Sequence, residues 1–306
     1  MSLNPLSLFR AMPGSIAQGM IWGVMALGVY ITFRLLDFAD LTVDGSIATG
    51  AAVSVMLIRA GVSPIATLPI AFLAGALAGM VTGLLNTALG IPGILASILT
   101  QISLYSINLN IMGKANQPVS VDNYSLVVSL RYVTDGSVSR LLFFLGMIVF
   151  LLALIAVMYW YFGTEQGHAI RATGCNSNMA RAQGINTNFI KVLALMISNG
   201  LVGLCGALYG QFQGASDVNM GRGAIVIGLA AVIIGEVLFS KRKLAFAFTL
   251  ASVILGAVIY YMVYQFVLWL KMPSEDMKLF SAIVVAIFLA IPYLKEKRTL
   301  RKGASK

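Results

Sequence analysis

Long apolar stretches recur from one end of the chain to the other and are separated by shorter polar or charged stretches. A helix that crosses a bilayer needs about 20 mostly apolar residues, with a range of about 17–25. No stretch shows the strict alternation of an outer-membrane β-barrel strand, so helices are the structure that satisfies the backbone in lipid. The segments that approach or meet this length are residues 15–35, 45–60, 65–88, 91–112, 139–162, 190–212, 223–239, 245–270 and 278–294.

Two of these segments, 45–60 and 223–239, are short for a complete span. A short apolar segment in a membrane protein is often a broken or re-entrant helix buried against its neighbours. The pattern therefore predicts an all-α fold, a polytopic transmembrane bundle of eight to ten spans with at least one broken or re-entrant helix. We expect residues 1–294 to form one transmembrane domain and residues 295–306 to form a basic cytoplasmic tail.

Composition indicates a membrane environment and excludes most soluble functions. Of the 306 residues, 59% are hydrophobic and 10% are charged, and the mean hydropathy is +0.89. Soluble domains carry about 25% charged residues. The net charge of +10 comes from Lys and Arg near helix ends, where they fix orientation. We therefore expect the lipid bilayer, and no nucleic acid, as a partner.

Residues that serve in metal and catalytic sites are scarce. The chain has two cysteines, Cys175 and Cys205, and one histidine, His168, with no CxxC pair and no His/Cys cluster. Neither an HExxH zinc motif nor a GxSxG nucleophile elbow occurs in the sequence. We therefore expect no catalytic residue, no metal site and no bound cofactor in this chain.

Loop charge predicts which helix ends face the cytoplasm. The tail beyond Ile291 is rich in Lys and Arg and holds a single acid, Glu296, so we expect it inside. The basic loops and the tail then all fall on one side, while the side of the N-terminus is left open. Counting spans backwards places 271–277 outside, Lys241-Arg242-Lys243 inside, 213–222 outside, 163–190 inside and 113–138 outside.

The inside loop 163–190 is long and polar although it connects two hydrophobic helices. Asn176 or Ser177 is a suitable cap for a short helix over 178–183, and Gly184 a suitable end. Such a helix presents a small apolar face, with Met179, Ala180 and Ala182 beside the cation Arg181. It suits the docking of a cytoplasmic partner, and the alternative is an ordinary solvated connector.

Polar side chains inside the spans usually face the interior of the bundle. Gln101, Ser103 and Asn108 interrupt an apolar helix that follows the break at 90–93, and broken helices commonly mark translocation paths. We predict that these residues line such a path, with Tyr209 and Gln211 as a second group. The alternative is hydrogen bonding between helices. The tyrosines Tyr260, Tyr261 and Tyr264 suit packing or an interfacial belt.

Two ionic groups lie near predicted helix ends. The aspartates Asp37, Asp40 and Asp44 follow Arg34, and we expect them to cap the next helix or to pair with Arg34, with a cytoplasmic gate as the alternative. Glu236 precedes Lys241-Arg242-Lys243 by about one turn, and we expect a local ion pair there.

Small residues recur at helical spacing in two spans. One set is Gly75, Gly79 and Gly83, and the other is Gly206 and Gly210. Glycines that share a helix face let two backbones approach closely in lipid, so we expect close helix packing at both sets. A moving helix interface is the functional alternative.

Three groups of residues resemble the permease family of branched-chain amino acid and ribose-type ATP-binding-cassette (ABC) importers. Within that family the chain looks most like a subgroup associated with aromatic amino acid uptake. The groups are Arg171-Ala172, Met179-Ala180, Gly184-Ile185-Asn186, Gly203, Gly206-Ala207-Leu208 and Gln211; then Ala26-Leu27-Gly28, Phe38-Ala39-Asp40, Gly45 and Gly50-Ala51; and lastly the run from Gly228 to Glu236.

The resemblance implies a multi-pass permease of the bacterial inner membrane whose loop 163–190 couples it to a motor. Its expected partners are cytoplasmic ABC ATPase subunits, a second permease copy or paralogue, and an extracytoplasmic solute-binding protein. The coupling residues it implies are Arg171, Asn178, Met179, Ala180, Arg181, Gly184 and Ile185.

The sequence independently assigns ATP hydrolysis to another subunit. A P-loop needs two spaced glycines followed by Lys and Ser or Thr, and here Gly113-Lys114 is followed by Ala115. ATP and magnesium are therefore expected on a partner. An ion-coupled secondary transporter acting alone is the alternative, but ionisable residues are expected near helix ends rather than at the midplane. The solute is expected to be an amino acid, and its identity is left open.

Overall fold

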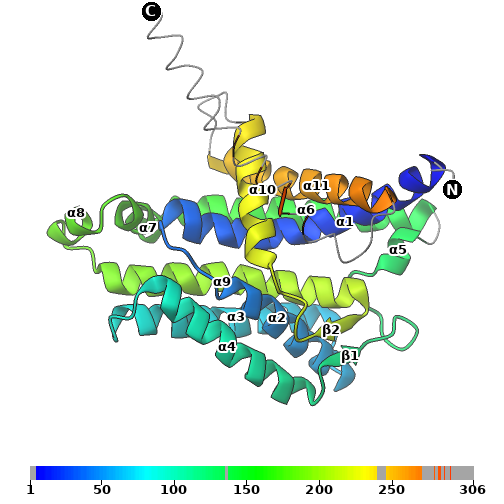
Figure 1. Cartoon of the computed structure of the whole chain (residues 1–306), viewed down its shortest axis with the longest axis horizontal. Helices are drawn as coiled ribbons and strands as arrows, with labels where there is room; N and C mark the ends of the chain where they lie inside the picture. Colours follow the sequence, from blue (N-terminus) through cyan, green and yellow to red (C-terminus); the bar gives the residue numbers. More distant parts are fainter. Residues whose placement is uncertain are drawn as a thin grey trace, which may run out of the picture.

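The computed structural model describes residues 5–134, 137–239 and 246–270, together with residues 279, 282, 283, 286 and 290 (Figure 1). Within these residues, six helical segments are long and apolar enough to cross a membrane, which confirms the predicted all-α, polytopic bundle. The segments are α1 (Pro5–Tyr30) with its π-helical extension η1 (Ile31–Leu35), α3 (Pro64–Thr87), α4 (Gly93–Met112), α6 (Ser137–Phe162), α9 (Thr187–Gln213) and α11 (Phe246–Trp269).

Shorter elements complete the described part of the chain. The two segments predicted to be short form α2 and α10, while the candidate span 278–294, the loop 271–277, the tail 295–306 and Lys241-Arg242-Lys243 lie outside the described residues apart from single positions. The number of spans therefore stays a prediction. The shorter elements are α2 (Val43–Arg59), β1 (Asn116–Pro118), α5 (Leu130–Thr134), α7 (Glu165–Cys175), α8 (Ser177–Ala182), β2 (Ala215–Asp217) and α10 (Ala224–Phe239).

Proline and glycine set several helix ends. Pro64 lies at the start of α3, where its missing N–H removes no helical hydrogen bond. Gly113 and Gly214 follow α4 and α9 with φ of 70° at both positions, a left-handed conformation that glycine adopts without steric cost. These local signals explain why the predicted boundaries lie within a few residues of those in the structure.

The chain between η1 and α2 is non-helical and partly buried: Asp37 and Ala39 are exposed, whereas Leu36, Asp40 and Thr42 are buried. Asp40 and Thr42 in this segment are 2% and 0% exposed. Irregular backbone at membrane depth is tolerated only where protein buries it or where it lines a cavity. The two short segments predicted to be broken or re-entrant form the continuous helices α2 and α10, so a broken or re-entrant helix stays a prediction.

Helix α9 lies at the centre of the fold and packs against α1, α2 and α3. A Cβ atom on Gly75 or Gly79 would overlap the backbone carbonyl of Asn199 or Leu195, and one on Gly206 would overlap that of Ile47. The close helix packing predicted from the glycine spacing is confirmed at these positions, and no larger side chain fits there.

The two ends of the bundle carry different elements. Helices α7 and α8 lie at one end, and α5, the two strands and the start of α1 lie at the other (Figure 1). The strands pair antiparallel, with Gln117 opposite Ser216. The loops 113–138 and 213–222, both predicted outside, therefore meet at the end opposite to α7 and α8, as the predicted orientation requires.

Helix α10 crosses the direction of α1, α9 and α11 instead of following it (Figure 1). Gly235 of α10 and Gly256 of α11 lie at the crossing, where a Cβ atom on either would overlap a backbone carbonyl of the other helix. The N-terminus of α10 reaches the first turn of α2, and this meeting point builds part of the candidate site.

Candidate functional site

The helix predicted at 178–183 is found as α8 and is held by local hydrogen bonds. The side-chain oxygen of Asn176 accepts hydrogen bonds from the backbone N–H groups of Asn178 and Met179, at 3.1 and 3.0 Å. Gly184 follows the helix with a φ of 84°. The polar cap and the terminal glycine are the two signals from which the helix was predicted.

Some of the predicted coupling residues on and just after α8 are exposed, and others pack against the bundle. Asn178 and Met179 are exposed, Met179 by 60%, while Ala180 is buried and Ile185 is partly buried. The exposed face therefore combines one apolar side chain with polar neighbours, which suits a protein contact.

Arg181 connects α8 to the start of α9. Its Nε donates to the Oγ1 of Thr187 at 2.6 Å, and its Nη2 donates to the Oδ1 of Asn188 at 3.2 Å. Thr187 is 1% exposed and Asn186 caps α9 by accepting from the N–H of Phe189. These hydrogen bonds attach α8 to the first turn of α9, the central helix.

Arg171 lies against aromatic rings within the bundle and does not share the exposed face of α8. Its guanidinium carbon is 4.2 Å from the ring centre of Phe246 in α11 and 5.7 Å from that of Phe162 in α6. Gly174 of the same helix packs on the backbone of Leu35 in η1. Helix α7 thus packs against α6, α11 and the π-helical extension of α1 at this end, and Arg171 makes cation–π contacts to the two rings.

Asp44 joins the N-terminal ends of α2 and α10 near the middle of the bundle. Its Oδ2 accepts from the N–H of Gly223 at 2.9 Å and its Oδ1 from the N–H of Ile225 at 3.0 Å. Gly45 beside it packs on Leu104, in the middle of α4. The carboxylate therefore caps α10, a helix far away in the sequence, and the expected pairing with Arg34 is wrong for this residue.

A cavity of about 260 Å³ adjoins this meeting point, and we call it the central cavity. Gln101 and Asn108 line it, and Asn108 is 1% exposed with no hydrogen-bond partner for its Oδ1 among the described residues, while their place on a translocation path stays a prediction. Ser103 is not among the lining residues; it is exposed, and its hydroxyl donates to the carbonyl of Leu99. The other lining residues are Asp44, Gly45, Ile102, Tyr105, Ser106, Val218 and Arg222.

Asp40 belongs to a buried network that supports the non-helical segment before α2. It accepts from the side chain of Asn199 at 2.6 Å and from the backbone of Thr42 at 2.9 Å, and Ser46 donates to Asn199 at 2.6 Å. Asn199 lies in the middle of α9. Asp40 lies just before α2 and Asp44 lies in its first turn, so the expectation that these ionisable residues lie near helix ends is confirmed.

Two further expectations about polar residues have different outcomes. Glu236 accepts two hydrogen bonds from Arg34, at 2.6 and 2.7 Å, while the basic cluster 241–243, with which a local ion pair was expected, lies outside the described residues. Gln211 is fully buried and bonds Ser54, Thr67 and the backbone of Val127. For Gln211 the structure therefore supports hydrogen bonding between helices.

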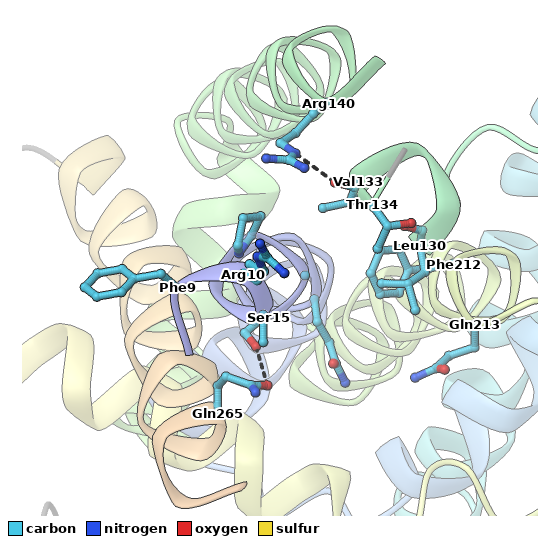
Figure 2. Close-up of a pocket in the computed structure, with 14 residues that line it drawn as sticks. Phe9, Arg10, Ser15, Leu130, Val133, Thr134, Arg140, Phe212, Gln213 and Gln265 are labelled. Carbon is cyan, nitrogen blue, oxygen red and sulfur yellow. Dashed lines mark hydrogen bonds between the residues drawn. The ribbon is translucent and has the colours of Figure 1, made fainter. Parts of the chain in front are cut away.

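A larger cavity of about 950 Å³ lies at the end that carries α5 and the start of α1, and we call it the outer cavity. Figure 2 shows Arg10 and Arg140 on its wall, with Ser15 donating to Gln265 at 2.8 Å and Arg140 donating to the carbonyl of Val133. Arginine and glutamine side chains give this cavity a basic, polar wall. Sequence reasoning missed it because its lining comes from α1, α5, α6, α9 and α11.

Tyr209 lines a third cavity of about 460 Å³, which we call the aromatic cavity. Trp22, Tyr260, Tyr261 and Tyr264 line it as well, although the last three were expected to serve in packing or an interfacial belt. Gln18 lines both the aromatic and the outer cavity, and Arg222 lines both the aromatic and the central cavity. The aromatic cavity therefore adjoins both of the other cavities through these two shared lining residues.

Transport permeases are similar to this chain over most of its length. A profile of the family described as branched-chain amino acid transport system / permease component matches residues 12–292. The chain is 40% identical to the tyrosine transport system permease protein of Clostridioides difficile (strain R20291), over 90% of this chain and 89% of that protein.

More distant relatives carry related names. The autoinducer 2 import system permease protein of Yersinia pseudotuberculosis (serotype O:3, strain YPIII) is 29% identical, over 82% of this chain and 68% of its own. An inner membrane ABC transporter permease protein of Escherichia coli (strain K12) is 27% identical, over 71% of this chain and 65% of its own. No solved structure matches the chain significantly.

Proposed function

We propose, since this chain belongs to the family of branched-chain amino acid transport system permease components, that the solute it carries is an aromatic amino acid, with tyrosine first among them. The chain is a multi-pass inner-membrane permease subunit of an ABC importer, and ATPase activity in such importers lies in separate subunits. Family membership therefore decides against the secondary transporter acting alone.

The observation that carries the choice of solute is the 40% identity to a tyrosine transport permease across nearly the whole of both chains. The aromatic cavity supports it, because a wall of tryptophan and tyrosine favours a ring-bearing solute over an aliphatic one. Gln101 and Asn108 are our proposed path residues beyond that cavity, since both line the central cavity.

We further propose that ATPase subunits dock on the exposed face of α8. Asn178 and Met179 would meet the ATPase, and Arg181 would transmit its movement to α9 through Thr187. The α7–α8 end and the C-terminus then face the cytoplasm. A solute-binding protein delivers the amino acid at the opposite end, where α5 and the outer cavity lie, and a second permease copy or paralogue completes the assembly.

Uptake by the reconstituted importer tests this function. The permease, its ATPase subunits and its binding protein are placed in liposomes, and entry of tritiated L-tyrosine, L-phenylalanine and L-leucine is followed. We expect ATP-dependent uptake of tyrosine that excess leucine does not inhibit. Preferential uptake of leucine would contradict the proposed solute class, and uptake by the permease alone under an ion gradient would contradict the division of labour.

A further inference from the structure

The aromatic cavity has the size and composition of a small-molecule site. Small-molecule sites usually occupy about 300–1,000 Å³ and combine apolar or aromatic walls with a few polar groups. This cavity of about 460 Å³ lies between α1, α9, α10 and α11, with Ala282 also on its wall. Its polar groups are few and include Gln18 and Arg222.

The rings on the wall are arranged edge to face or tilted and not stacked flat. The ring centre of Trp22 lies 5.3 Å from that of Tyr209, at an interplanar angle of 76°, and 5.6 Å from that of Tyr261. Tyr264 continues the set at 6.1 Å from Tyr261. A further ring in this cavity would make contacts of the same kind, which are the ones aromatic pairs prefer.

Trp22 offers a hydrogen-bond donor that the protein does not use. The side chain is 4% exposed, and its Nε1 has no hydrogen-bond partner among the described residues. An unsatisfied buried donor destabilises a folded protein, so native structures usually supply it with an acceptor. The Nε1 atom is itself buried, so an oxygen atom of a bound molecule can accept from it only where the neighbouring side chains move aside.

Arg222 supplies the charge for the same molecule. Its guanidinium has no hydrogen-bond or ion-pair partner in the described part of the chain, and the residue lies at the end of the loop 213–222, just before α10. Arg222 is exposed, so its guanidinium is accessible to an anionic group of a molecule in the cavity. Guanidinium binds carboxylate with two parallel hydrogen bonds, which suits the carboxylate that every free amino acid carries.

We propose that the aromatic cavity binds one free aromatic amino acid, with its ring against Trp22, Tyr209 and Tyr261 and its carboxylate on Arg222. The inference rests on the proposed function, and it adds a solute-binding site inside a single permease. The ammonium group of the solute faces tyrosine rings, which attract cations. Gln18 and Arg222 connect this site to the outer and the central cavity, so the site is an intermediate station on the route.

Binding of tritiated L-tyrosine to the purified full-length permease in nanodiscs, without ATPase or binding protein, tests the site. We expect saturable binding to one site for each chain. L-phenylalanine should compete well, while L-leucine should bind at least about tenfold more weakly because it lacks the ring. Tyramine, which is tyrosine without its carboxylate, should also bind at least about tenfold more weakly.

The contribution of Arg222 is isolated by comparing two ligands on two proteins. Arg222→Gln should weaken tyrosine binding about tenfold or more, the usual loss for a hydrogen bond to a charged group, and should leave tyramine binding unchanged. Trp22→Phe, which keeps a ring but removes the donor, should weaken tyrosine binding about threefold or more. Trp160→Phe is the matched control, because Trp160 is 70% exposed on α6 and should leave binding unchanged.

Tyramine binding also reports whether the Arg222 variant is folded. An equal loss of tyrosine and tyramine binding in Arg222→Gln would overturn the assignment of the carboxylate to Arg222. Absence of saturable tyrosine binding by the unmodified permease would overturn the site, even where the assembled importer takes up tyrosine with ATP. Uptake of leucine instead of tyrosine by that importer would contradict the proposed function and is measured independently.

Discussion

The packed centre around α9 and the α7–α8 end are held together in different ways. In the centre, glycines of α3 and α9 bring backbones into direct contact and buried polar groups such as Asp40 and Asn199 bond one another. At the α7–α8 end, α8 depends on one polar cap and on the bonds from Arg181, and most of its surface is exposed. The centre is therefore tightly packed, whereas α8 is accessible and is attached by few hydrogen bonds.

The largest effect is expected from overfilling the centre. Gly79→Leu places a side chain where the carbonyl of Leu195 already lies, so α3 and α9 cannot approach and we expect no stable permease in the membrane. Overpacking a core typically destabilises a protein by about 1–3 kcal/mol, and here the backbone of α9 must move as well. Thermal unfolding in detergent measures the outcome.

Gly146→Ala is the matched control for this change. A Cβ atom at Gly146 of α6 meets nothing within 4 Å among the described residues. Because alanine favours a helix over glycine by about 1 kcal/mol, the control should be neutral or slightly stabilising. A folded Gly79→Leu permease with unchanged stability would remove the contrast between the two regions.

The next effect concerns transport and not folding. Arg181→Glu removes the bonds to Thr187 and Asn188 and reverses a charge, so it should disconnect α8 from α9. We expect ATP-driven tyrosine uptake to fall about tenfold or more, as for loss of a charge-assisted bond, while the midpoint of thermal unfolding changes little. Lys114→Glu at the opposite end is the control. Equal uptake by Arg181→Glu and the unmodified importer would exclude this route of coupling.

A smaller effect is expected from removing the cap of α8. Asn176→Ala deletes the acceptor for two backbone N–H groups, at a cost of about 0.5–2 kcal/mol to the helix. Hydrogen exchange at Asn178 and Met179 should become faster while exchange in α9 stays slow. Ser177→Ala is the control because no cap bond involves that hydroxyl. Unchanged exchange in Asn176→Ala would show that α8 is held by other contacts.

The smallest effect is expected from the ion pair between η1 and α10. Arg34 and Glu236 are 53% and 23% exposed at their side chains, and exposed pairs contribute about 1 kcal/mol or less. A double-mutant cycle with Arg34→Gln and Glu236→Gln should give a coupling energy of this order that falls with added salt. A coupling energy of several kcal/mol would contradict this expectation and show that the pair stabilises the fold as strongly as the packed centre does.

The sequence predicts well the features that neighbouring residues determine. Helix α8 is predicted from Asn176 and Gly184 because its cap and its end are only a few residues apart. The glycines of α3 predict a tightly packed face, because their spacing of four residues can be read directly from the sequence. They do not identify α9 as the partner, because a local pattern does not indicate which other helix packs against that face.

Features that join distant segments could not be predicted from one sequence. Asp44 caps α10, which begins about 180 residues later in the sequence. Its position in the sequence instead suggested that it would cap α2, the next helix. Trp22 and Arg222 line one cavity only because α1, α9, α10 and α11 converge. Neither residue has a sequence signal of its own, since a tryptophan in a span and an arginine in a loop are both ordinary.

The most direct test of the account is the accessibility of Cys175, which lies exposed at the end of α7, whereas Cys205 is buried. A membrane-impermeant maleimide should label Cys175 in inside-out vesicles and not in intact cells, with Cys175→Ser as the blank. Added ATPase subunits should slow the labelling, because they cover the adjoining α8. Labelling from outside intact cells would place this end on the wrong side of the membrane and contradict its role as the contact with the ATPase.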